Sequence, residues 1–216
     1  MDKKLDQTSL YALQDDVLEI INRCDNDFYL TGGTCLHRFI SPRRYSDDLD
    51  FFSGDAGLFR EFSREVVSRL KESDLDILTE SDTRDFIRIR INGVLKADLV
   101  CDRVYRYGRS ETSPEGYRID NIMNILGNKI SALIGRDEPK DVFDIATIRE
   151  TTGVDWGLAL DIAGKKCTFD RDYLLYRLQS FPVGLLDYLA VIKNEYRDSC
   201  RKIIPVILEE ISNTGS

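Results

Sequence analysis

Residues 29–52 read YLTGGTCLHRFISPRRYSDDLDFF, and this stretch combines a glycine turn, a basic loop and two closely spaced carboxylates. Residues 28–30 are typical of a short buried strand, and Gly32 and Gly33 let the chain turn and a ligand approach the backbone. A short helix is predicted over residues 34–40. Its start would present free backbone N–H groups and the positive end of the helix dipole, which suits a phosphate.

Two aspartates follow within an apolar and aromatic run that favours a strand. Asp48 and Asp50 are two positions apart, so they would point to the same face, about 6.5–7 Å from each other. Carboxylates placed in this way can hold one or two hard cations such as Mg²⁺ and leave positions for triphosphate oxygens. The alternative is an acidic turn with solvated side chains. Leu49 and Phe51 would bury the opposite face, which favours the metal site, whereas Asp47 has the wrong parity.

A third acid lies in a predicted β-hairpin. The Asn-Gly pair at residues 92–93 is a strong signal for a tight hairpin turn. In the return strand, residues 94–100, Asp98 is the lone acid in a run that is apolar except for Lys96, and a carboxylate there needs a partner. Asp98 is therefore either a third metal ligand or the partner of Arg88 or Arg90 across the hairpin.

The composition narrows the function. A net charge of −8 argues against a surface coated in basic residues for nonspecific nucleic-acid binding, although a local patch remains compatible with it. Five scattered cysteines without a Cys-x-x-Cys pair, and a single histidine, His37, give poor support to a zinc site, a disulfide framework or a Ser-His nucleophile. The start MDKKLDQTSL lacks the apolar segment of a signal peptide, and no stretch is long enough to span a membrane. We expect a cytoplasmic protein.

Apolar spacing predicts the remaining elements. A first helix covers residues 10–21 with Ser9 as its N-cap. The later residues form a helical bundle. The other predicted helices span residues 57–72, 122–135, 138–151, 156–164, 173–178, 183–191 and 203–211; the predicted strands span 75–79, 86–91 and 94–100; and residues 102–116 form a long loop.

Four motifs follow one another along residues 29–145. They are Gly32-Gly33-Thr34; Ser46 with Asp48-Leu49-Asp50-Phe51; Lys129 with Ala132, Leu133 and Arg136; and Lys140-Asp141 with Phe143, Asp144 and Ile145. This series resembles the polymerase-β-like nucleotidyltransferase superfamily, and it is most similar to the AbiEii/AbiGii toxin branch. The chain departs from many superfamily members at Gly33, where they have serine, a change that the toxin branch tolerates.

The resemblance implies an α/β (α+β) fold: a minimal nucleotidyltransferase core with a mixed β-sheet flanked by helices over residues 1–116, and a C-terminal helical bundle over residues 117–216. It also implies that the protein transfers a nucleotide from an NTP to a hydroxyl acceptor, RNA or tRNA, with Mg²⁺ or Mn²⁺. The implied role is the toxin of a type IV toxin–antitoxin or phage abortive-infection system, restrained by a separately encoded antitoxin.

The resemblance also assigns roles to residues. Asp48, Asp50 and Asp98 would hold the metal, with Asp98 alternatively accepting the proton of the acceptor hydroxyl. The predicted nucleotide contacts are Gly32, Gly33, Thr34, Ser46, Lys129, Arg136 and Asp141, where Lys129 would counter triphosphate charge and Asp141 and Asp144 would hold Lys129, the base or the ribose. The predicted RNA contacts are Arg43, Arg44, Arg88 and Arg90.

Two alternatives remain open. The acceptor could be a small molecule such as an aminoglycoside, because a chain of this acidity suits a cationic drug. The chain could also be a nucleotide-binding regulator without turnover. Loss of an acidic ligand would favour that role, but Asp48, Asp50, Asp98 and Lys129 are all present.

Overall fold

The computed structural model describes residues 6–214, which form two compact units. The sheet unit comprises the described residues up to Cys35, together with Ser46–Arg103 and Ser110–Asp120; the helical unit comprises Leu36–Tyr45, Val104–Arg109 and the described residues from Asn121 onward. The units are interleaved in the sequence, whereas a single division was expected after residue 116. Residues 1–5, at the start considered for a signal peptide, and residues 215–216 of the SNTGS end lie outside the described range.

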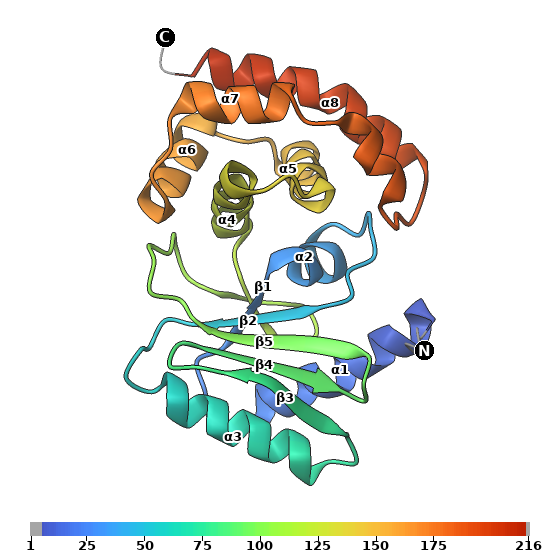
Figure 1. Ribbon diagram of the computed structural model, residues 1–216, viewed down its shortest axis with the longest axis vertical. Coiled ribbons are helices and arrows are strands. Elements are labelled where there is room, and N and C mark those ends of the chain that lie inside the picture. The colour runs from blue at the N-terminus through green and yellow to red at the C-terminus, as the bar shows by residue number, and fades with distance from the viewer. Residues whose placement is uncertain (1–5, 215–216) are drawn as a thin grey trace. The chain divides into compact units, whose positions relative to one another are not determined.

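The sheet unit contains a mixed sheet of seven strands in the order β3-β4-β5-β2-β1-β7-β6. The pairs β2–β5 and β1–β7 are parallel and the other neighbours are antiparallel, which confirms the predicted mixed sheet. Figure 1 labels strands β1–β5 of this sheet. The strands are β1 (Tyr29–Thr31), β2 (Leu49–Ser53), β3 (Ile77–Asp82), β4 (Phe86–Ile91), β5 (Leu95–Cys101), β6 (Glu111–Thr112) and β7 (Arg118–Ile119).

One face of the sheet is apolar because alternate strand residues point toward it. Helix α1 (Gln7–Arg23) packs against β5 and against α3 (Phe59–Glu72), which in turn packs against β3. The rings of Phe28 and Phe59 meet edge to face, with centroids 5.9 Å apart. The opposite face carries the polar residues of the same strands, so the polar and charged side chains of the central strands lie together on one side of the sheet.

The helical unit is built around α4 (Ile122–Gly135), which contacts α5 (Pro139–Thr152), α6 (Trp156–Lys166) and α7 (Arg171–Gln179) (Figure 1). Helix α8 (Glu195–Ser212) packs against α5, α6 and α7. The bounds of α4 and α5 match the predicted helices within a residue, because both begin and end at local signals such as the cap Asn121.

Several predicted helix starts are wrong, and the largest error is at α8, which begins at Glu195 rather than at residue 203. Helix α1 begins two residues before the predicted N-cap, because the carboxylate of Asp6 accepts the N–H groups of Thr8 and Ser9. The helix predicted over residues 34–40 begins at Gly32 as α2 (Gly32–Cys35) and continues as a π-helix, η1 (Leu36–Ile40). The wider turn follows from the bond that the N–H of Ser41 donates to the carbonyl of Leu36 (2.7 Å).

Two further segments differ from the prediction. Residues 183–191 form only a 3₁₀-helix, η2 (Val183–Tyr188), because the following backbone bonds to the segment at residues 43–45 instead. The predicted loop over residues 102–116 contains β6, which pairs with β7. Strands of two residues are too short to show alternation in a sequence.

Within residues 6–214, no helix is long and apolar enough to cross a lipid bilayer. All five cysteine thiols are free.

Candidate active site

The register of the central strands brings the predicted carboxylates of the sheet unit together. Asp50 on β2 is the partner of Asp98 on β5 in a parallel pair, and of Thr31 on β1 in an antiparallel pair. Partners in register point to the same face of a sheet. Asp48 immediately precedes β2, two residues before Asp50, and lies on this polar face as well. The three acids therefore belong to one patch.

Two cations of the same face bond to these acids. Lys96 on β5 lies 2.8 Å from the carboxylate of Asp48. Arg88 on β4 donates two hydrogen bonds, of 2.8 and 2.7 Å, to the two oxygens of Asp98. These bonds to Asp98 raise the pKa of Arg88 further. The cross-hairpin partner considered for Asp98 is thus present, and it is Arg88.

The glycine turn lies directly against one acid. Gly32 has a φ of +71°, which side chains other than glycine rarely adopt, and a Cβ at this position would lie 2.7 Å from Oδ2 of Asp50. Glycine is therefore required here for two reasons, the backbone conformation and the space that Asp50 occupies. The turn predicted to bind phosphate and the acid predicted to bind metal are neighbours.

Thr34 and Ser46 lie beneath this patch and are buried. Their hydroxyl groups are hydrogen-bonded to each other (2.9 Å), and the Thr34 hydroxyl also donates to the backbone carbonyl of Asp48. Both were predicted to contact the nucleotide. Their bonds give them a positioning role, because they hold the backbone that carries Asp48.

A buried acid that the sequence analysis missed extends the patch. Asp120 follows β7 and is fully buried, and it accepts a hydrogen bond of 2.7 Å from the hydroxyl of Thr31. Thr31 is the register partner of Asp50, so Asp120 lies two strands from Asp50. Its only signal in the sequence is an acid that directly follows Ile119.

The helical unit contains a separate ionic network centred on Asp144. This carboxylate is fully buried and accepts bonds from Arg44 at 2.7 and 2.8 Å, from Lys129 at 2.7 Å and from Nε2 of His37 at 2.7 Å. Lys129 also bonds to Asp141 (3.0 Å). The network therefore joins α4 and α5 to the segment at residues 36–45, where His37 and Arg44 lie.

The charges in this network support one another. Burial opposes the ionised form of Asp144, but the charges of Arg44 and Lys129 outweigh it and hold the pKa of Asp144 well below its usual range. Burial likewise opposes the charge of Lys129, yet Asp144 and Asp141 raise its pKa. For His37, burial prevails over the contact with Asp144 and lowers the pKa.

Several residues of this network were predicted to contact the nucleotide. Lys129 is 7% exposed and its ammonium group faces two carboxylates, so its role as a triphosphate contact stays a prediction. Arg136 donates to Asp141 (2.7 Å), which is fully buried. The predicted roles of Arg136, Asp141 and Asp144 in nucleotide binding likewise stay predictions.

The predicted RNA contacts have partners within their own units. Arg44 is 5% exposed and bonds to Asp144 through two nitrogens, so its role as an RNA contact stays a prediction. Arg43 bonds to Glu150 and lies over the ring of Tyr196, and Arg90 bonds to Glu80 across the β3–β4 pair. The sequence shows the cations but not these partners, which come from distant segments.

The donor set of the polar face fits a hard divalent cation, because Asp48, Asp50 and Asp98 supply only carboxylate oxygens. Among residues 6–214, however, no three acidic, histidine or cysteine side chains converge as they would around an ion. Two of the three carboxylates are bonded to cations instead, Asp48 to Lys96 and Asp98 to Arg88.

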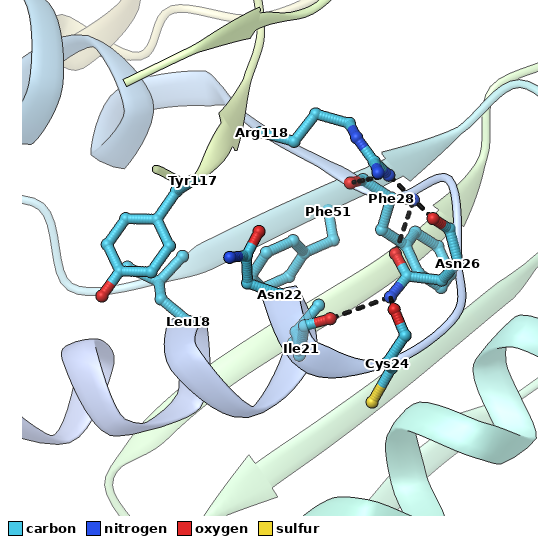
Figure 2. Close-up of a pocket in the computed structure, with 9 residues that line it drawn as sticks. All are labelled: Leu18, Ile21, Asn22, Cys24, Asn26, Phe28, Phe51, Tyr117 and Arg118. Carbon is cyan, nitrogen blue, oxygen red and sulfur yellow. Dashed lines mark hydrogen bonds between the residues drawn. The ribbon is translucent and has the colours of Figure 1, made fainter. Parts of the chain in front are cut away.

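The small hollow in Figure 2 lies on the other face of the sheet. It is lined by Leu18 of α1 and Phe51 of β2 among others, and Phe51 points away from the face that carries Asp50. Its volume of about 20 Å³ holds one or two water molecules. It has no part in the carboxylate patch.

Comparison with solved structures defines the class of the fold. The chain is similar to MenT4, a nucleotidyltransferase toxin from Mycobacterium tuberculosis, with a TM-score of 0.67, 15% identity and coverage of 97% of this chain and 85% of that one. It is also similar to JHP933 from Helicobacter pylori, with a TM-score of 0.63, 18% identity and coverage of 95% and 93%. The fold is thus that of an α/β nucleotidyltransferase.

The sequence identifies the family. Residues 20–208 match the family model described as nucleotidyl transferase AbiEii toxin, type IV toxin–antitoxin system. The chain therefore belongs to the AbiEii family of toxin nucleotidyltransferases, as its motifs indicated. No curated protein matches the chain.

Proposed function

We propose that this protein is a Mg²⁺-dependent toxin that transfers a nucleotide from an NTP to a hydroxyl group of RNA, with tRNA as the expected acceptor. The observation that carries the proposal is the register of β2 with β5, which places Asp50 beside Asp98 on the face that also holds Asp48. Membership of a family of toxin nucleotidyltransferases supports the reaction class and an antitoxin as partner. We further propose that it acts in the cytoplasm, where NTPs and tRNA occur.

In this reaction the acceptor oxygen forms a bond to the α-phosphorus of the NTP. The bond between that phosphorus and the bridging oxygen breaks, and pyrophosphate leaves with the electron pair. Asp48, Asp50 and Asp98 would hold Mg²⁺, which supplies charge neutralisation for the phosphates when bound. Alternatively, Asp98, which is bonded to Arg88, would accept the proton of the attacking hydroxyl. Positioning of the acceptor hydroxyl against the α-phosphate would lower the barrier further.

The test uses the purified protein, total RNA, Mg²⁺ and each of the four NTPs labelled at the α-phosphate. We expect one or more of the NTPs to label RNA, and Asp48→Asn or Asp50→Asn to abolish labelling without lowering the melting temperature. Asp47→Asn is the matched control, because Asp47 is adjacent and exposed and bonds to Gln7 rather than to the patch. Labelling that survives Asp48→Asn and Asp50→Asn would contradict the metal site. Labelling of a small hydroxyl compound alone would contradict the RNA acceptor.

Expression in a bacterial host tests the toxin role. Without an antitoxin, the wild-type chain should arrest growth, whereas the Asp48→Asn variant at equal abundance should not. Equal growth with both proteins would refute the role as a toxin and leave nucleotide transfer to be judged by the labelling experiment.

A further inference from the structure

Two cations are built into the polar face of the sheet unit beside the three acids. Lys96 lies on β5 two residues before Asp98, so both point to the same face. Arg88 on β4 is the register partner of Asp98. Each cation bonds to one acid, Lys96 to Asp48 and Arg88 to Asp98. The patch is thus a compact set of alternating charges formed by three adjacent strands.

The bond between Lys96 and Asp48 is weak enough to be exchanged. Their side chains are 24% and 39% exposed, and ion pairs in contact with solvent contribute at most about 1 kcal/mol. The pair of Arg88 with Asp98 is bidentate and the Asp98 side chain is only 9% exposed, but the Arg88 side chain is 37% exposed, so part of it reaches solvent. A ligand with a higher charge can therefore displace either cation from its carboxylate.

The balance of charge indicates which ligand this is. A free triphosphate meets cations that are already bonded to Asp48 and Asp98. A divalent cation alone must displace Lys96 and Arg88, which would then lose their partners. When a divalent cation and a triphosphate arrive together, the metal can take the carboxylates and the two released cations can take phosphate oxygens. Lysine and arginine are the usual side chains for that purpose.

We propose that Lys96 and Arg88 are triphosphate-binding residues that the acids Asp48 and Asp98 hold until the metal–nucleotide complex binds. This inference rests on the proposed function and adds the residues that bind the phosphates and the order of binding. It also predicts that metal binding and nucleotide binding depend strongly on each other. The metal displaces the carboxylates from Lys96 and Arg88, and the phosphates draw these two cations away from the carboxylates. Neither residue was a predicted nucleotide contact, since Lys96 was given no site role and Arg88 was predicted to contact RNA.

The test measures binding and requires no turnover. Mn²⁺ binding to the nucleotide-free protein is followed by the electron paramagnetic resonance of the free ion, and binding of α,β-methylene NTPs in Mg²⁺ is followed by calorimetry. In Lys96→Met and Arg88→Gln we expect Mn²⁺ alone to bind about threefold or more tightly, because its competitor is gone. We expect the nucleotide in Mg²⁺ to bind about tenfold or more weakly, about 1.4 kcal/mol, because a phosphate contact is gone.

The matched controls are Lys71→Met and Arg60→Gln on α3. Lys71 and Arg60 belong to the helix that covers the opposite, apolar face, and both affinities should equal those of the wild type. Melting temperatures establish that each variant folds, and Lys96→Gln provides a second change at Lys96. The proposal requires both changes in the same variant. It would be overturned by weaker nucleotide binding without tighter Mn²⁺ binding, by tighter Mn²⁺ binding alone, or by no change in either affinity.

The outcome is separable from that of the proposed function. If Asp48→Asn keeps RNA labelling, the proposed function fails whatever the binding data show. If Asp48→Asn abolishes labelling while Lys96→Met leaves both affinities unchanged, the reaction stands and only the inference on Lys96 and Arg88 fails.

Discussion

Removal of the Asp144 carboxylate should strongly destabilise the helical unit. Asp144 is fully buried and accepts four bonds from Arg44, Lys129 and His37. Asp144→Ala leaves two buried cations short of a partner, and breaking a buried ion pair from one side costs about 3–5 kcal/mol. For a chain of this size, that loss corresponds to a decrease of roughly 6–20 °C in the melting temperature.

The assay is thermal and urea unfolding followed by circular dichroism at pH 7.5. The pH matters because the pKa of Asp144 is lowered in the folded state. Its stabilisation is then complete above the unfolded value of about 3.9 and is lost as the pH falls through the folded value. The matched control is Asp187→Asn, which removes an exposed pair with Arg201 and should cost less than about 1 kcal/mol.

A double-mutant cycle identifies the cause. In an Arg44→Met background, Asp144→Ala should cost less than it does in the wild type, because one of the unpaired cations is already absent. If Asp144→Ala lowers the free energy of unfolding no more than Asp187→Asn does, the buried network is not a source of stability. The role of Asp144 would then be in substrate binding or catalysis, as predicted from its motif.

Two further predictions concern Gly32 and His37. Gly32→Ala should lower the free energy of unfolding by about 1–2 kcal/mol because Gly32 has a left-handed backbone conformation. It should also reduce RNA labelling, because the Asp50 side chain must move away from the new Cβ. The control is Gly54→Ala, where a Cβ has open space around it, and unchanged labelling in Gly32→Ala would contradict the close approach of Gly32 to Asp50. His37 is the single histidine, so its NMR titration is unambiguous. Because burial lowers the pKa of His37, we expect a midpoint below about 6.5. The midpoint should fall further in Asp144→Asn, because the Asp144 carboxylate raises the pKa of His37. Stability should decrease as the pH drops below that value, and a midpoint above it would show that the bond to Asp144 outweighs burial.

The sequence by itself determined the local features of this protein. Alternation in the strands predicted which side of the sheet Asp48, Asp50 and Asp98 occupy, and the Asn-Gly turn at residues 92–93, with φ values of +52° and +72°, predicted the hairpin. The bounds of α4 followed from its cap and its apolar spacing. Such features depend on neighbours within a few positions, so they can be inferred from spacing alone.

Only the tertiary structure decided which distant residues meet. The parallel pairing of β2 with β5 made Asp50 the neighbour of Asp98 and brought Lys96 to Asp48, although hydrophobic alternation is compatible with several strand orders. Arg44 reached Asp144 across 100 positions of the sequence. A buried charge must have a partner, but its own sequence neighbourhood does not indicate which residue provides one, because that choice depends on how whole elements pack.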